Sequence, residues 1–229
     1  MVRVVLRIVL VLAVIPLLLS LAYNVVNPVS TLMLARWITG ARVERVWTPI
    51  EAMSPALVRT VIASEDARFC FHPGVDIAEM RAAIETADDI EETRGASTIP
   101  MQIAKNLFLW PGRELIRKAI EIPLALWLDL VVSKRRLIEI YLNIAEWGPD
   151  GEFGVAAGAR RAFDLPPSRV DARQAALLAV MLPNPHRRDA GNPSVGVQRL
   201  ASRLQARVPR EGPELTSCLG PLRGDGARP

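Results

Sequence analysis

The chain has 229 residues, of which 50% are hydrophobic, with a net charge of +4 and a sequence pI of about 9.6. This apolar content excludes a largely disordered chain and suits one domain with an additional segment, or at most two small domains. The mild basic excess agrees with anionic lipid headgroups, phosphate-bearing substrates or nucleic acid as partners, and does not choose among them.

The N-terminal segment carries no charged residue from Ile8 to Ala35 and follows two arginines. Its apolar part has the roughly 17 to 25 residues that span a bilayer, and the positive-inside rule then places the N-terminus in the cytoplasm. We therefore predict a cytoplasmic tail at residues 1–7, a transmembrane signal-anchor at residues 8–24, and the remainder outside the membrane. A cleaved signal peptide is the competing interpretation, because residues 20–22 offer small side chains at a suitable spacing.

Helical patterns dominate the rest of the chain, after one short strand predicted at residues 43–47. Serine or aspartate caps followed by apolar residues at helical spacing mark the helix starts. Pro123 should kink or divide the helix in which it lies. The class is therefore mainly α, with a globular domain at residues 25–208. The predicted helices begin at or near Ser54, Asp76, Ser97, Glu114, Ser133, Asp171 and Ser194.

The C-terminal segment, residues 209–229, is rich in Pro, Gly and Arg, and we predict that it is disordered. Cys218 lies in this segment, far in sequence from Cys70, and the pair lacks the spacing of a metal site. A disulfide would require an oxidising compartment. Two unrelated thiols are the favoured interpretation.

One segment between two predicted helices is dense in titratable groups: it contains Glu65, Asp66, His72 and Asp76. Such groups at the boundary of a helix and a loop are typical of functional sites. Neighbouring acidic residues are also common at ordinary helix ends, so this segment does not define a site by itself.

A second segment, residues 95–106, places small polar residues at a helix start, where free backbone N–H groups can bind anionic oxygen. Gln102 and Lys105 are three residues apart and share one face of this helix. Further cations follow, among them Arg117, which is spaced i,i+4 from Glu121. An ordinary helix salt bridge is the alternative interpretation of that pair.

At these residues the chain resembles the family 51 glycosyltransferases, the transglycosylase domain of penicillin-binding proteins. The resemblance covers about residues 45–205 and is strongest to the monofunctional biosynthetic peptidoglycan transglycosylases. Four ordered motifs carry it: Glu65-Asp66-x-x-Phe69-x-x-His72-x-Gly74, the stretch Gly95 to Asn106, Arg117-Lys118-x-x-Glu121, and Ser133-Lys134-x-x-Leu137-Ile138-Glu139-x-Tyr141-Leu142-Asn143.

The lysines support this resemblance, because the chain has only three and all lie within the motifs: Lys105, Lys118 and Lys134. Met101 departs from the family pattern, which usually has a glutamine there, and this puts one polar contact in doubt. The transpeptidase signatures Ser-x-x-Lys and Lys-Thr-Gly are absent from the sequence.

The resemblance implies a lysozyme-like, mainly α glycosyltransferase domain with an N-terminal transmembrane helix. It implies an inverting hexosyltransferase that polymerises lipid II into glycan strands and releases polyprenyl diphosphate. We assign Glu65 as the general base, and Lys105 and Arg113 as the direct pyrophosphate ligands. Glu121 is the second expected catalytic carboxylate, and it could orient the attacking sugar, pair with a cation or hold a divalent ion. The remaining expected substrate-binding residues are Ser97, Thr98, Gln102, Asn106, Arg117 and Lys118.

No ligand cluster predicts a metal site, so a divalent cation, Mg or Mn, is optional beside the pyrophosphate. The expected location is the cytoplasmic (inner) membrane, single-pass, with the catalytic domain on the periplasmic side. Residues such as Leu32 and Trp37 could rest in the membrane or pack in the core. We expect lipid II, the growing glycan and the membrane as partners, with proteins of cell-wall synthesis and division as additional ones. Nucleic acid is not expected, because the basic residues are dispersed.

Two other functions fit parts of the sequence. A glycan-cleaving lytic enzyme would also use one glutamate, but it would not need a group of cations for a pyrophosphate. A membrane-anchored scaffold of the cell-wall machinery would need neither Glu65 nor Lys105. The combination of carboxylates and cations therefore favours the transferase.

Overall fold

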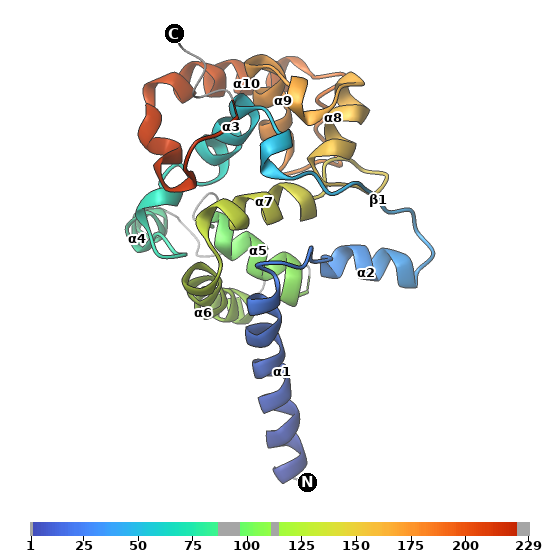
Figure 1. The fold of residues 1–229 in the computed structure, drawn as a ribbon, viewed down its shortest axis with the longest axis vertical. Coiled ribbons are helices and arrows are strands. Elements are labelled where there is room, and N and C mark those ends of the chain that lie inside the picture. Colours follow the sequence, from blue (N-terminus) through green and yellow to red (C-terminus); the bar gives the residue numbers. More distant parts are fainter. Residues whose placement is uncertain (1, 87–96, 111–114, 224–229) are drawn as a thin grey trace.

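The computed structural model describes residues 2–86, 97–110 and 115–223, and it is mainly helical. Helix α1 (Val2–Ala22) projects from one end of the molecule, and α10 (Val195–Arg207) lies at the opposite end of the longest axis (Figure 1). Across these described ranges, no helix combines the length and the apolar character needed to cross a bilayer.

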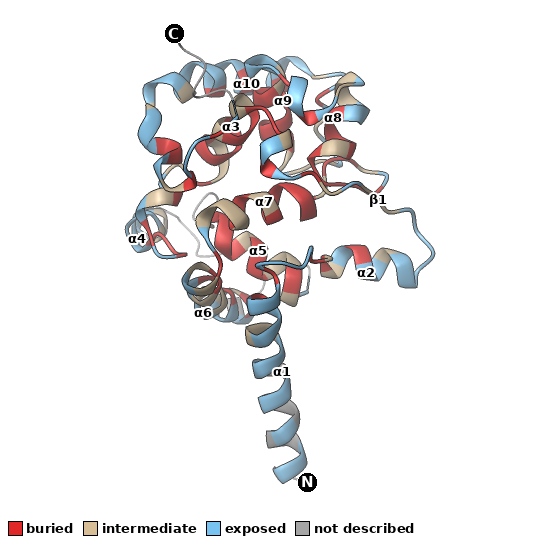
Figure 2. Ribbon diagram, in the orientation of Figure 1, coloured by how far each residue is buried: buried red, intermediate tan, exposed pale blue. Residues whose placement is uncertain are grey.

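The part of the domain farthest from α1 is built from α3 (Pro55–Glu65), α8 (Val155–Phe163), α9 (Ala172–Met181) and α10. Helix α9 lies between α3 and α10 and is buried along most of its length (Figure 2). The predicted starts of α3, α9 and α10 are confirmed, since Ser54, Asp171 and Ser194 cap them.

The middle of the domain consists of α5 (Ile99–Phe108), α6 (Leu115–Val131) and α7 (Lys134–Ile144), and α5 packs against the other two. Ser133 caps α7 as predicted, and α6 continues through Pro123 without being divided. Helix α4 (Ile77–Thr86) begins after Asp76, whose carboxylate accepts the Glu79 N–H at 3.0 Å. Helix α2 (Thr31–Ile38) and helix α8 were not predicted.

The strand predicted at residues 43–47 is reduced to two residues, β1 (Glu44–Arg45), which pairs in parallel with β2 (Glu152–Phe153). Beyond β1, the chain is fixed to α7 by Asn143, whose amide oxygen accepts the Thr48 N–H at 2.7 Å. Short 3₁₀ helices complete the fold: η1 (Ile50–Ala52), η2 (Phe69–Phe71), η4 (Pro167–Arg169), η5 (Val208–Arg210) and η6 (Pro213–Leu219).

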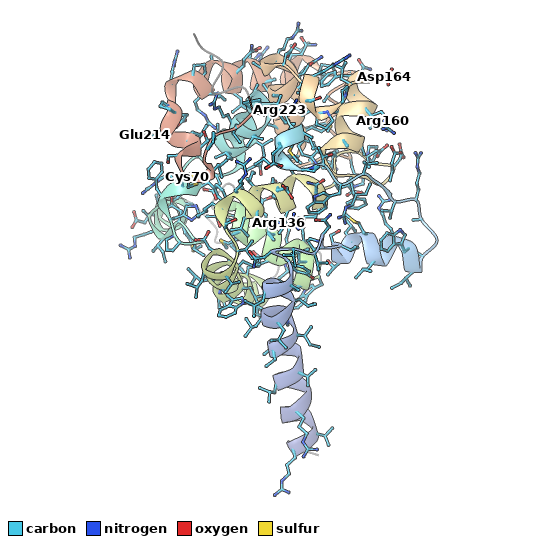
Figure 3. The ribbon with its side chains drawn as sticks, in the orientation of Figure 1. Cys70, Arg136, Arg160, Asp164, Glu214 and Arg223 are labelled. Carbon is cyan, nitrogen blue, oxygen red and sulfur yellow. A yellow bond between two sulfur atoms is a disulfide. The ribbon has the colours of Figure 1, made fainter. Side chains whose placement is uncertain are left out.

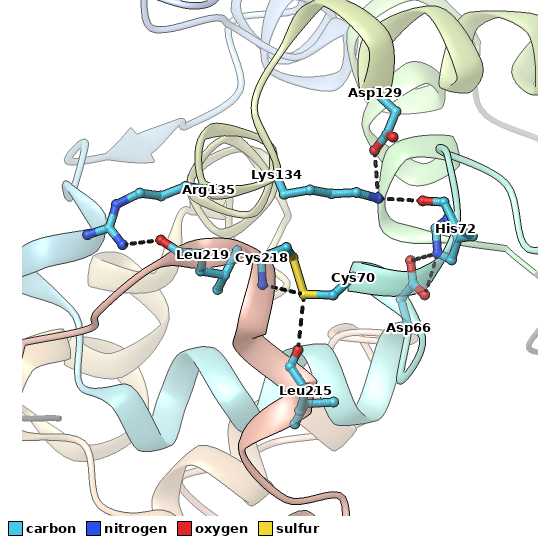
Figure 4. Close-up of a disulfide and its surroundings, with 9 residues drawn as sticks. All are labelled: Asp66, Cys70, His72, Asp129, Lys134, Arg135, Leu215, Cys218 and Leu219. Atoms are coloured by element: carbon cyan, nitrogen blue, oxygen red, sulfur yellow. Dashed lines mark hydrogen bonds and ion pairs between the residues drawn. A yellow bond between two sulfur atoms is a disulfide. The ribbon is translucent and has the colours of Figure 1, made fainter.

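The C-terminal segment departs from prediction, because residues 209–223 are folded onto the domain. Leu215, Leu219 and Leu222 are buried in the core, which provides the apolar contacts that a disordered segment lacks. A disulfide joins Cys218 to Cys70 in η2, so the interpretation of two unrelated thiols is wrong (Figure 4). The part of the predicted tail after residue 223 lies outside the described residues.

The C-terminal end of α1 and the residue that follows it are attached to the domain by several contacts. Tyr23 stacks on Phe108 of α5, and the Trp127 indole N–H donates to the Leu17 carbonyl at 3.3 Å. Arg136 of α7, labelled in Figure 3, donates to the Tyr23 carbonyl at 2.9 Å. Helix α1 is therefore fixed at its base rather than joined by a loose linker.

Candidate active site

Glu65 is the last residue of α3 and lies in the wall of a cleft of about 170 Å³. Pro55 at the first turn and an apolar face that is buried in the core fix the direction of this helix. Glu65 lines this cleft at the point where the chain leaves the helix. The cleft is also lined by Ser64, Asp66, Arg68, Asp76, Glu79, Ser97, Thr98 and Arg207.

The Glu65 carboxylate has polar partners from two other helices. Gln102 of α5 donates to Oε2 at 3.1 Å, and the Tyr141 hydroxyl of α7 lies 3.4 Å from the same oxygen. The Tyr141 hydroxyl is also 3.1 Å from the Gln102 amide oxygen, and its single hydrogen can be donated to one of the two acceptors. Burial raises the pKa of Glu65, and these donors and the Lys105 charge oppose that rise. A carboxyl group in this environment is suited to accept a proton near neutral pH.

Asp66 fixes the loop that follows Glu65. Its carboxylate accepts the Ile99 N–H at 2.9 Å and faces the His72 Nε2 at 2.9 Å. Lys134 then donates to the His72 carbonyl at 2.7 Å and pairs with Asp129 (Figure 4). Asp66 and His72 are buried and positioned by each other, so their contacts hold the loop rather than a substrate.

The start of α5 differs by one residue from prediction, because Thr98 rather than Ser97 caps it. The Thr98 hydroxyl also donates to the Gly74 carbonyl at 2.6 Å. Gly74 has a positive φ, and a Cβ there would lie 2.4 Å from the Ala125 carbonyl oxygen of α6, so only glycine fits this approach. Thr98 thus fixes the start of α5 to Gly74 and also lines the cleft, and Ser97 accepts a hydrogen bond from Lys118 and lines the same cleft.

Three cations interact beside Glu65, since Lys105 couples electrostatically both to Glu65 and to Arg117. Burial lowers the pKa of Lys105, and the Arg117 charge lowers it further. Burial, with the charges of Arg117 and Lys105, lowers the pKa of Lys118 to about 8. Cations that lower one another's pKa form a ready-made site for a multiply charged anion.

Glu121 is buried and forms an ion pair with Arg117, and its second oxygen lies 3.9 Å from Lys118 Nζ. Of the three roles open to Glu121 from sequence, pairing with a cation is therefore the one that the contacts support. The i,i+4 salt bridge considered from sequence is therefore present, and it fixes the position of Arg117 beside Lys105 and Lys118.

The remaining predicted residues lie as follows. Gln102 donates a hydrogen bond to the Glu65 carboxylate. Met101 is instead fully buried against Val75 and Ala125. The departure at Met101 therefore alters core packing and not the carboxylate. Asn106 contributes its backbone carbonyl, which accepts from Thr31 of α2 at 3.2 Å. Arg113 lies outside the described residues.

Tyr141 belongs to the fourth motif, but the sequence alone assigned it no role in the site. In the structure its hydroxyl reaches Glu65. Burial raises its pKa well above the ordinary value, so it remains a neutral donor. The available signal was a polar-tipped aromatic among apolar residues of α7, and this pattern is equally typical of core packing. Ser64, 3.4 Å from Glu65 Oε1, had no signal beyond its position next to Glu65.

The residues do not form a ligand set for a resident divalent cation. Within the described ranges, no three His, Cys, Asp or Glu side chains converge as metal ligands. Glu121, the carboxylate nearest to the cations, is occupied by Arg117. No chemical step at this site is therefore assigned to a metal.

This arrangement, a recessed carboxylate beside clustered cations on a helical domain, defines a class of group-transferring enzyme that handles an anionic leaving group. The transglycosylase family model matches residues 32–208, and the chain belongs to that family.

The chain is 54% identical over 217 residues to the biosynthetic peptidoglycan transglycosylase of Rhodopseudomonas palustris (strain TIE-1), covering 95% of this chain and 91% of that relative. It is also 54% identical to the protein of that name from Nitrobacter hamburgensis, covering 91% of this chain and 92% of the relative. The Agrobacterium fabrum protein of that name is 53% identical, with 82% of each chain covered.

Proposed function

We propose that this protein is a peptidoglycan glycosyltransferase that polymerises lipid II into glycan strands and releases polyprenyl diphosphate. The observation that carries the proposal is Glu65, recessed in a cleft and flanked through Lys105 by a group of cations. The relatives named above are biosynthetic peptidoglycan transglycosylases, and this agrees with such a reaction in cell-wall synthesis.

In the proposed reaction, the 4-hydroxyl of the acceptor sugar attacks the anomeric carbon of the lipid-linked strand. Glu65 accepts the hydroxyl proton as the new C–O bond forms, and the bond to the pyrophosphate oxygen breaks with its electron pair. The raised pKa of Glu65 improves the match between this base and an alcohol. Gln102 donates to Oε2 and the Ser64 hydroxyl lies 3.4 Å from Oε1, and these contacts orient the carboxylate for proton transfer. The anomeric centre inverts.

The leaving pyrophosphate is assigned to Lys105, Arg117 and Lys118. Charge that is placed in advance where negative charge develops is often the largest catalytic contribution. Ser97 and Glu121 orient Lys118 and Arg117, so their proposed roles are to position the cations. Arg113 remains a proposed ligand from the resemblance. A Mg or Mn ion would arrive with the pyrophosphate rather than in a protein site.

The test is polymerisation of labelled lipid-linked disaccharide by the detergent-purified full chain, comparing wild type with Glu65→Gln. We expect polymer from the wild type and a loss of roughly 10²- to 10⁴-fold in rate from the variant, the usual contribution of a general base. Glu214→Gln, an exposed carboxyl on η6, is the matched control and should retain wild-type activity. Unchanged activity in Glu65→Gln would favour the scaffold function, and glycan release from purified cell wall would favour the lytic enzyme.

We also propose that α1 anchors the protein in the inner membrane, with the catalytic domain on the periplasmic side in a lysozyme-like fold. Support comes from the uncharged N-terminal run and from exposed apolar residues on α2 and α6, helices that lie toward the same end of the molecule as α1 (Figure 1). Trp37 and Ile38 of α2 are 52% and 86% exposed, and Leu130 of α6 is 78% exposed. Exposed apolar groups of this size, when clustered, mark a membrane or protein contact. Proteins of cell-wall synthesis and division are proposed partners at the same membrane.

Quenching by spin-labelled lipids tests this membrane contact. We expect that nitroxides placed in the lipid quench Trp37 when the full chain is reconstituted in vesicles. The Trp37→Phe variant assigns the signal, because the loss of quenched emission on this substitution identifies Trp37 among the five tryptophans of the chain. Emission from Trp37 that is insensitive to nitroxide depth would place α2 away from the bilayer.

A further inference from the structure

Helix α10 presents a stripe of arginines that connects the cleft to a second cavity. Arg199, Arg203 and Arg207 are spaced i, i+4 and i+8 and therefore share one face over roughly 12 Å of helix. Arg207 lines the cleft of Glu65 and donates to the Ala63 carbonyl. Arg199 and Arg203 instead line the second cavity, so the stripe begins at the cleft wall and leads away from it.

The second cavity has a volume of about 570 Å³ and four arginines in its lining, Arg187, Arg188, Arg199 and Arg203. None of its lining residues is acidic. Arg188 is held by the Val180 carbonyl at 2.6 Å. A concave surface lined by one sign of charge concentrates ions of the opposite sign.

The charge on this face is not explained by the fold. Helix α10 contains no acidic residue, and arginines four apart on a helix repel one another. Glu211 pairs with Arg207 at the cleft end of the stripe, at 3.5 Å. An anionic ligand along Arg203 and Arg199 would relieve this repulsion.

Two anionic surfaces could meet the stripe, a lipid headgroup layer or an acidic polymer. Figure 1 places α10 at the end of the molecule opposite α1. If α1 is the anchor, the stripe faces away from the membrane that holds the enzyme, and this favours a polymer. The product strand carries peptides with free carboxylates along its length, and it must leave the cleft as it grows.

We propose that the α10 arginine stripe and the second cavity bind the peptide carboxylates of the outgoing glycan strand. This inference rests on the proposed function for the identity of the strand. In this proposal, Arg207 is the end of the stripe at the cleft, and Arg203 and Arg199 continue it along α10. Arg187 and Arg188 of the second cavity lie at its outer end. The contacts are with the peptides rather than with the sugars, because guanidinium groups recognise carboxylates.

The test measures binding of end-labelled, uncrosslinked peptidoglycan strands to the detergent-purified full chain by fluorescence anisotropy. For Arg199→Gln/Arg203→Gln we expect binding about fivefold weaker, since each exposed ion pair contributes a factor of about 1.5 to 5. Arg199→Lys/Arg203→Lys keeps both charges, and we expect it to bind more tightly than the glutamine pair but more weakly than wild type, because lysine lacks the guanidinium fork. Arg169→Gln/Arg173→Gln removes two exposed charges outside both cavities and is the matched control.

The same strands after an amidase has removed their peptides distinguish the ligand chemistry. They should bind wild type weakly and be insensitive to Arg199→Gln/Arg203→Gln. Equal binding of peptide-bearing and peptide-free strands, or equal weakening by the control pair, would overturn the proposal. The proposal would also be overturned if Arg199→Gln/Arg203→Gln weakened binding only to vesicles of anionic lipid or to inorganic phosphate. The assay uses finished strands and needs no turnover, so its outcome is independent of whether the enzyme polymerises lipid II.

Discussion

Two regions of the molecule differ in which side chains they expose to water: the cleft, and the end that carries α1, α2 and α6. Around Glu65, polar groups are withdrawn from water and given partners from α5 and α7. On α2 and α6, large apolar groups such as Trp37 and Leu130 are left exposed. Each arrangement costs free energy in water and therefore calls for an explanation. We propose proton transfer as the reason for the first arrangement, and a lipid surface that holds the substrate tail close to the cleft as the reason for the second.

The sharpest way to test the cleft side of this comparison is to remove a cation while the Glu65 side chain stays in place. We expect Lys105→Met to lower kcat/KM by roughly 10²- to 10³-fold, the usual cost of losing one preorganised electrostatic group. The readout is the initial rate of polymerisation at several substrate concentrations, with Arg169→Gln as the control for an exposed charge. A wild-type rate in Lys105→Met would show that Lys105 does not contribute to the reaction.

A smaller effect is expected where the base keeps its carboxylate but loses a donor. Gln102→Leu removes the 3.1 Å hydrogen bond to Glu65, so the pKa of Glu65 should rise further. We expect a loss of about tenfold in rate near pH 7, corresponding to about 1.4 kcal/mol, with the acid side of the pH profile displaced upward. Met101→Leu, a buried neighbour that does not face the carboxylate, should leave that profile in place.

The disulfide should have the smallest effect on rate and a clear effect on stability. Cys70→Ala/Cys218→Ala removes a cross-link over 148 residues, and we expect the protein to lose about 2–5 kcal/mol of unfolding free energy. Thermal unfolding of the purified double variant measures this loss, and polymerisation at low temperature should remain near wild type. An activity loss that exceeds the fraction unfolded would mean that η2 also orients Glu65.

Sequence reasoning identified the elements whose signals are local. The caps at Ser54, Ser133 and Ser194 are side-chain hydrogen bonds to backbone three residues away, and each predicted a helix correctly. Helix α2 was missed because its apolar residues continue the uncharged run before it. The segment 209–223 was mistaken for disorder because its few leucines gain their burial from contacts distant in sequence.

In the site, too, residues within sequence motifs could be predicted, whereas contacts between residues distant in sequence could not. Glu65 and Gln102 were selected from motifs, and the structure brings them within hydrogen-bonding distance. Thr98 was assigned to substrate and lines the cleft, and its hydroxyl also donates to the Gly74 carbonyl, a contact that no spacing could reveal. Tyr141 reaches Glu65 from 76 residues away, and only the packing of α7 against α5 makes that contact visible.

The most direct test of the account is the pH dependence of kcat/KM for wild type beside Glu65→Gln. Glu65 acts when deprotonated, so the rate should fall as pH decreases through a pKa that lies above the ordinary carboxyl value. Lys118 acts when protonated, so the rate should fall as pH rises through about 8. The account predicts a bell-shaped profile whose acid side disappears in Glu65→Gln. An acid side that persists unchanged in that variant would contradict Glu65 as the base.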